Sequence, residues 1–109
     1  MWICLNDAFF SIVRPSYLEH GVLLVRARRA GDIERVWPDA TVERTAGRDY
    51  LYRARISETE VGAAISARIS AIDYDNFKDS VKDHALHDAY FKVWHAMAGL
   101  QNPAPYREE

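Results

Sequence analysis

The sequence predicts an α+β protein in which an antiparallel sheet carries helices on one face. Up to residue 56, apolar and polar residues alternate in short runs, as they do in half-buried strands. Beyond residue 56 the apolar residues recur at helical spacing. Because the strands come first and do not alternate strictly with helices, an antiparallel sheet is favoured over a parallel one.

The first three strands are expected at residues 2–5, 9–13 and 22–28. The turn-prone residues 6–8 separate the first two runs, which predicts an N-terminal hairpin. The third strand has two different sides: Leu23, Val25 and Ala27 on one, and Leu24, Arg26 and Arg28 on the other.

A short helix and a second hairpin follow. Gly31 and Asp32 suit a helix N-cap, and Pro38 ends this helix. Residues 41–45 and 49–56 alternate again and predict two paired strands. In the second of these, Tyr50, Tyr52, Ala54 and Ile56 share the side expected to face the helices, whereas Leu51, Arg53 and Arg55 share the other.

The C-terminal half predicts helices. Ser57 and Glu60 have the spacing of a capping box, so a helix begins here, with an apolar stripe made of Val61, Ala64, Ile65, Ile69 and Ile72. One helical turn is expected at residues 77–81. A last helix at residues 84–100 has an apolar side that we expect to face the core: Leu86, Ala89, Tyr90, Val93, Met97 and Leu100.

The predicted order is β-β-β-α-β-β-α-α, and residues 22–72 contain part of the split βαβ pattern of ferredoxin-like folds. That fold carries many unrelated functions, so it does not predict one. A length of 109 residues suits one domain, which we expect at residues 1–101, followed by a flexible tail at 102–109.

Composition excludes some classes of protein. No apolar stretch approaches the ~20 residues that cross a bilayer, and Asn6 and Asp7 interrupt the first apolar run before a signal peptide is formed. We therefore expect a cytoplasmic protein that does not engage a membrane. Cys4 is the single cysteine, which rules out an internal disulfide, and we expect it to be a buried thiol.

Four arginines predict a positive sheet face. If the apolar sides of their strands face the helices, Arg26, Arg28, Arg53 and Arg55 all project from the opposite face. Guanidinium groups bind phosphates, so this face can hold nucleic acid or an acidic protein. The alternative is that Glu43 and neighbouring acids pair with these arginines across strands. The tyrosines are expected on the core side, which counts against base stacking.

Two residues on the last helix are candidate metal ligands. His84 and Asp88 are four residues apart, away from the apolar side, and can reach the same divalent ion. A closed site needs ligands from another segment. The alternative is an ordinary polar helix face.

A partner interface is the third candidate site. Phe91 lies on the polar side of the last helix. On the preceding helix, the residues Gly62, Ser66 and Ser70 are small enough to let another backbone approach closely. We expect the chain to associate with itself or with another protein through these residues.

The sequence contains no G-x-S-x-G, no glycine-rich phosphate loop and no H-E-x-x-H, and we expect no cofactor. Residues 2–9, 24–34 and 72–78 resemble a group of small conserved hypothetical proteins of bacteria and their phages. That resemblance implies a bacterial or phage origin and no catalytic residue. We expect a non-enzymatic interaction or regulatory module; the alternatives are nucleic-acid binding through the arginine face and a small metal-assisted enzyme.

Overall fold

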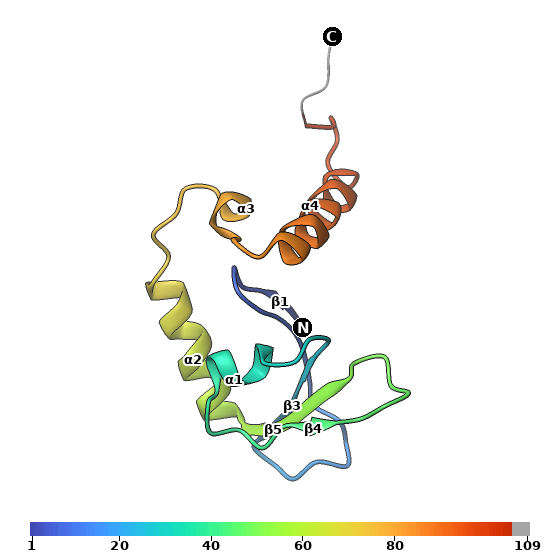
Figure 1. Cartoon of the computed structure of the whole chain (residues 1–109), viewed down its shortest axis with the longest axis vertical. Helices are drawn as coiled ribbons and strands as arrows, with labels where there is room; N and C mark the ends of the chain where they lie inside the picture. Colours follow the sequence, from blue (N-terminus) through green and yellow to red (C-terminus); the bar gives the residue numbers. More distant parts are fainter. Residues whose placement is uncertain (106–109) are drawn as a thin grey trace. The chain divides into compact units, whose positions relative to one another are not determined.

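The structure is a computed structural model, and it describes residues 1–105 (Figure 1). Two compact units are distinguished, one spanning Met1–Asp73 and the other beginning at Tyr74. Part of the predicted tail, residues 106–109, lies outside the described residues.

The first unit contains a five-stranded sheet in the order β1-β2-β3-β5-β4, and all neighbouring strands are antiparallel. This confirms the predicted sheet, with strands that are shorter than expected in the second hairpin. The strands are β1 (Trp2–Cys4), β2 (Phe9–Val13), β3 (Val22–Ala27), β4 (Glu43–Arg44) and β5 (Tyr52–Ser57).

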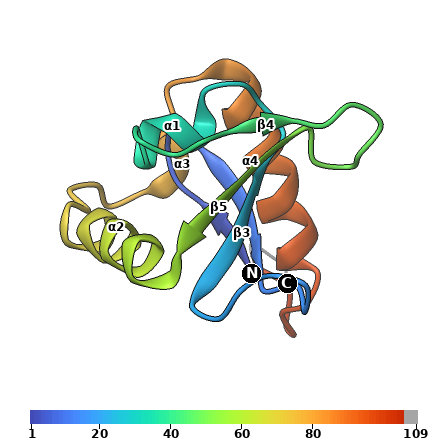
Figure 2. The same cartoon turned by 90° about the horizontal axis from the view of Figure 1, so that it is seen from below.

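The partly ferredoxin-like order is also present. Helix α1 (Asp32–Val36) connects β3 to β4, and β5 lies between these two strands. Because β3 and β4 each pair antiparallel with β5, they run parallel to one another. Figure 2 shows β3 and β5 side by side at the centre of the sheet. This is the split βαβ arrangement.

Helices α1 and α2 (Glu58–Ser70) cover one face of the sheet (Figures 1 and 2). Ser57 caps α2, since its hydroxyl accepts from the Glu60 N–H over 3.2 Å, as the capping-box spacing predicts. At the start of α1, Gly31 occupies the N-cap position with φ 88°, a conformation that glycine tolerates. Asp32 does not cap this helix and is instead buried.

The core of the first unit lies between these helices and the sheet. Phe10 from β2 meets Trp37 edge-on, with ring centroids 5.2 Å apart. The Trp37 indole N–H donates to the Glu60 carbonyl over 3.2 Å, which ties the end of α1 to α2. Other core residues come from β3, β5 and α2: Val25, Ala27, Ala54, Ile56 and Val61.

The predicted stripe of α2 is only partly buried. Val61 is buried, whereas Ile69 is exposed, as is Ile72 beyond the helix. The stripe is therefore covered at its start and exposed at its end. The last turn of α2 contributes no residue to the buried core.

The second unit contains α3 (Phe77–Ser80) and α4 (His84–Ala98). Asn76 caps α3, and the Asp83 carboxylate caps α4 by accepting from the Leu86 N–H over 2.8 Å. Leu86 and Tyr90 are buried, and the Tyr90 ring lies 5.3 Å from the Phe77 ring.

The second half of α4 differs from the prediction. Val93, Met97 and Leu100, which were expected to face a core, are all exposed. Helix α3 has only four residues, and its ring contact with α4 is made at Tyr90, in the first half of that helix. No helix in the described residues has both the length and the apolar character needed to cross a membrane.

Candidate functional site

The arginine face is defined by Arg26, Arg28, Arg53 and Arg55, and strand register explains it. Arg26 stands directly opposite Arg53 in the β3–β5 pair, and Leu24 stands opposite Arg55. Their strand neighbours Val25 and Ala54 belong to the core. Successive side chains of a strand alternate between faces, so these arginines occupy the sheet face away from α1 and α2.

Most of the arginine face is held by the chain itself. Arg26 Nη2 donates to the Ser11 hydroxyl over 2.6 Å, and Arg28 Nη1 donates to the Asp49 carbonyl over 2.6 Å. Arg53 Nη2 lies 3.3 Å from Asp49 Oδ1. The side chain of Arg55 is exposed and makes no hydrogen bond or ion pair within residues 1–105. Arg55 is thus the member most available to a ligand.

Tyr50 lies on the arginine face, and its predicted place on the core side was wrong. The guanidinium carbons of Arg26 and Arg28 lie 4.6 and 4.2 Å from the centroid of its ring. Strand β5 begins at Tyr52, so the alternation that was applied to Tyr50 does not extend to it. Stacking with guanidinium groups accounts for the burial of this ring on a polar face.

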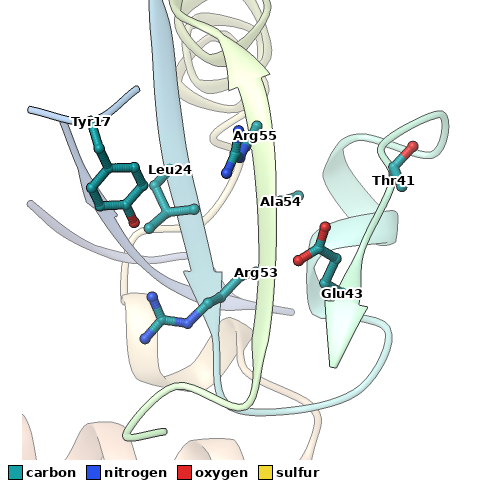
Figure 3. Close-up of a pocket in the computed structure, with 7 residues that line it drawn as sticks. All are labelled: Tyr17, Leu24, Thr41, Glu43, Arg53, Ala54 and Arg55. Atoms are coloured by element: carbon teal, nitrogen blue, oxygen red, sulfur yellow. The ribbon is translucent and has the colours of Figure 1, made fainter. Parts of the chain in front are cut away.

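A cleft of about 450 Å³ opens beside Arg53 and Arg55 (Figure 3). Tyr17 and Leu24 line it on the β3 side, and Glu43 lines it on the β4 side. Glu43 is the strand neighbour of Arg53, yet the ion pair of Arg53 is made with Asp49. The cleft therefore carries charges of both signs.

The candidate metal ligands His84 and Asp88 lie on α4. Asp88 Oδ1 is 3.9 Å from the Nδ1 of His87. Within residues 1–105, no three His, Cys, Asp or Glu side chains are close enough together to hold a metal ion. Two ligands alone do not complete a four-coordinate zinc site.

The predicted partner interface draws on both units. Phe91 stacks on Trp94 in the second unit, and the Lys78 ammonium lies 4.3 Å from the Trp94 ring centroid and 5.2 Å from that of Phe91. Gly62, Ser66 and Ser70 belong to α2 in the first unit. The residues of the predicted interface therefore belong to two units, and the interface stays a prediction.

Strand β1 is an edge of the sheet, and its pairing shows which backbone groups face outward. The Met1 amino group donates to the Ile12 carbonyl, and the Ile12 N–H donates to the Met1 carbonyl, both over 2.8 Å. Along an antiparallel pair, hydrogen-bonded and non-hydrogen-bonded positions alternate. The backbone N–H and C=O groups of Met1 and Ile3 therefore face β2. The N–H and C=O groups of Trp2 and Cys4 point away from the sheet.

An apolar groove of about 550 Å³ lies beside this edge, between the sheet and α2. Its apolar walls are formed by Ile3, Ile12 and Leu23 from the sheet and by Val61, Ile65 and Ile69 from α2. Gly62 and Ser66 of the predicted interface also line it. A side chain added at Gly62 meets no atom within 4 Å, so the groove has room at this position.

Two ion pairs hold α2, one near each end of the helix. At one end Arg14 Nη2 lies 2.6 Å from Glu58 Oε2. At the other end Arg68 binds Asp7 through two contacts of 2.8 and 3.1 Å. Arg14 and Glu58 also line the groove, and most of its other lining residues are apolar.

Cys4 is exposed, so its expected burial was wrong. It faces away from the core, on the side that carries Trp2 and Phe9, because it pairs with Phe9 in the register of β1 and β2. Partial burial of its sulfur nevertheless raises the pKa of the Cys4 thiol.

Comparison with known proteins supplies no relative: no family model, curated protein or solved structure matches this chain.

Proposed function

We propose that this protein is a non-enzymatic interaction module of the cytoplasm, and that it binds an extended protein segment along β1. The observation that carries the proposal is the juxtaposition of an open strand edge and an apolar groove. The edge offers outward N–H and C=O groups at Trp2 and Cys4, and the groove lies between that edge and α2.

The two edges of the sheet differ in a way that supports this proposal. Proteins commonly protect an edge strand with charged residues, proline or a very short length, because an open edge pairs with other chains. The β4 edge is two residues long and both are charged. Residues 1–5 at the β1 edge contain neither a charged side chain nor a proline.

Strand addition explains how both features would be used. Backbone hydrogen bonds to an edge strand supply affinity, and pockets for alternate side chains supply specificity. A strand laid against β1 would direct every second side chain to the side of Ile3, which lines the groove. The open space at Gly62 leaves room for such a side chain.

The proposal is tested with a fluorescent peptide that copies residues 1–6, with serine in place of Cys4. We expect saturable binding by anisotropy, and a loss of at least tenfold in affinity for Gly62→Trp, which fills the groove. Ala67→Trp is the matched control, because Ala67 is an exposed residue of α2 outside the groove. A monomeric wild-type protein that fails to bind the peptide overturns the proposal, as does equal binding by Gly62→Trp.

Polyanion binding at the arginine face is a second candidate, favoured by the position of Arg26 opposite Arg53. Like charges directly opposite on neighbouring strands destabilise a sheet, and a phosphate between them would relieve the repulsion. Binding to single-stranded DNA should weaken steeply with salt and should decrease in Arg55→Ala more than in the loop variant Arg48→Ala. Absence of binding at low salt removes this candidate. No observation favours the metal-assisted enzyme.

A further inference from the structure

We infer that the strand added to β1 is β1 of a second copy, antiparallel to the first and related to it by a two-fold axis at Ile3. This inference rests on the proposed function and names the partner of that edge. It follows from the hydrogen-bonding pattern of β1 and from the order of its side chains.

The backbone pattern fits this register. A two-fold axis at Ile3 places Trp2 of each copy opposite Cys4 of the other. These are the residues whose N–H and C=O groups point outward from the sheet. In an antiparallel pair, two residues at such a position exchange both backbone hydrogen bonds. Both Trp2–Cys4 pairs therefore satisfy all the outward groups of the strand, and the sheet continues across the axis.

The side chains are self-complementary in the same register. On one face Ile3 meets Ile3 of the second copy, and Met1 meets Leu5 of the second copy. On the other face the large Trp2 meets the small Cys4. No side chain of residues 1–5 is charged, so the two-fold axis brings no like-charged side chains together.

Exposure gives a further reason for a second copy. Met1 is 80% exposed and Trp2 is 74% exposed, although both are large apolar residues at a sheet edge. Pairing about Ile3 covers both residues in both copies. A two-fold interface uses the same patch twice, so each apolar contact contributes in duplicate.

The register is tested by a disulfide. In a Cys4→Ser background, Ile3→Cys should give a covalent dimer on mild oxidation, because residues facing each other at a non-hydrogen-bonded position have Cα atoms about 4.5 Å apart, within disulfide range. Ala67→Cys in the same background is the exposed control and should remain monomeric on a non-reducing gel. Equal crosslinking of both variants, or none of Ile3→Cys, overturns the inference.

Wild-type Cys4 supplies a second control. In the inferred register the two Cys4 residues are diagonal to one another, with a Cα separation of roughly 8 Å, which is too far for a disulfide. Oxidation of the wild-type protein should therefore leave it unlinked. Efficient crosslinking through Cys4 would place the axis at Cys4 and overturn the register centred on Ile3.

Light scattering separates this inference from the proposed function. The wild-type protein should run as a dimer, and Cys4→Lys, which puts a charge on the edge, should run as a monomer with an unchanged circular-dichroism spectrum. A monomeric wild type that binds the peptide keeps the proposed function and overturns the second copy. A monomeric wild type that does not bind the peptide overturns both the proposed function and the second copy. A wild-type dimer that Cys4→Lys leaves intact uses another surface and overturns the inference.

Discussion

Arg68 and Asp7 are 61 residues apart in the sequence and form a two-point ion pair, with Nη1–Oδ1 at 2.8 Å and Nη2–Oδ2 at 3.1 Å. The pair joins the last turns of α2 to the turn between β1 and β2. It thereby holds one wall of the groove beside the edge strand, so its contribution to stability bears directly on the proposed site.

A double-mutant cycle on Asp7→Ala and Arg68→Ala should give a coupling energy of about 0.5–1 kcal/mol. The value is modest because both side chains are partly exposed and the pair is screened by solvent. Urea unfolding of the four proteins measures it, and 1 M salt should reduce it. The more exposed single contact between Arg14 and Glu58 is the comparison and should couple more weakly. A coupling of zero for Asp7 and Arg68 contradicts this prediction.

Asp32 should contribute much more to stability than an exposed acid. Its carboxylate is buried and accepts from the Phe9 N–H over 3.2 Å and from Arg35 Nη1 over 2.7 Å. Asp32→Ala removes these bonds and a longer one from Arg29 Nη2 at 3.5 Å, and it leaves a backbone donor unsatisfied, so we expect a loss of roughly 2–3 kcal/mol in the free energy of unfolding.

The control for Asp32 is Asp73→Ala, which changes an exposed acid and should alter stability by less than about 0.5 kcal/mol. Both variants are measured by urea unfolding. Equal stabilities for the two would show that the contacts of Asp32 do not hold β2 to α1. The loss should also be smaller for Asp32→Asn, which keeps an acceptor for the Phe9 N–H.

The sheet could be predicted from the sequence because local alternation reports which strand residues are half buried. The capping box at Ser57 was equally readable, since it depends on residues three apart. Asp32 shows where such reasoning ends. Its position before a helix suggests a cap, but its actual partners include Phe9, which is 23 residues away. Only the folded chain brings that donor to the carboxylate.

The candidate sites were predictable to different degrees. The shared face of Arg26 and Arg53 follows from alternation, whereas the contacts of their guanidinium groups depend on the loop that carries Asp49 and Tyr50. The groove was not predicted as such. Its sequence signals are an uncharged first strand and the small residues Gly62 and Ser66, and neither signal shows that the two features lie side by side.

The Cys4 thiol should ionise at a higher pH in the folded protein than in the unfolded one. Partial burial disfavours the thiolate and raises its pKa. Reaction with a thiol reagent should therefore be slow near neutral pH, and its pH profile should lie above the profile measured in urea. Because the folded protein favours the protonated thiol, Cys4 stabilises it. This stabilisation is fully present below the pKa of the unfolded chain and is lost as pH rises through the pKa of the folded protein. A folded profile at or below the unfolded one contradicts the prediction.

The two halves of the apolar side of α4 should respond differently to truncation. Leu86 is 5% exposed and lies in the turns that α3 reaches, whereas Met97 is 58% exposed. Leu86→Ala removes buried methyl groups and should lower the free energy of unfolding by about 2–4 kcal/mol. Met97→Ala removes side-chain atoms that are already in water, so its effect should stay below about 0.5 kcal/mol.

Alanine suits a helix interior, which leaves burial as the main difference between the two variants. Urea unfolding followed by circular dichroism compares them directly. If Met97→Ala destabilises the protein as strongly as Leu86→Ala, Met97 is covered in solution, and the second half of α4 must then be counted among the contact surfaces of the protein.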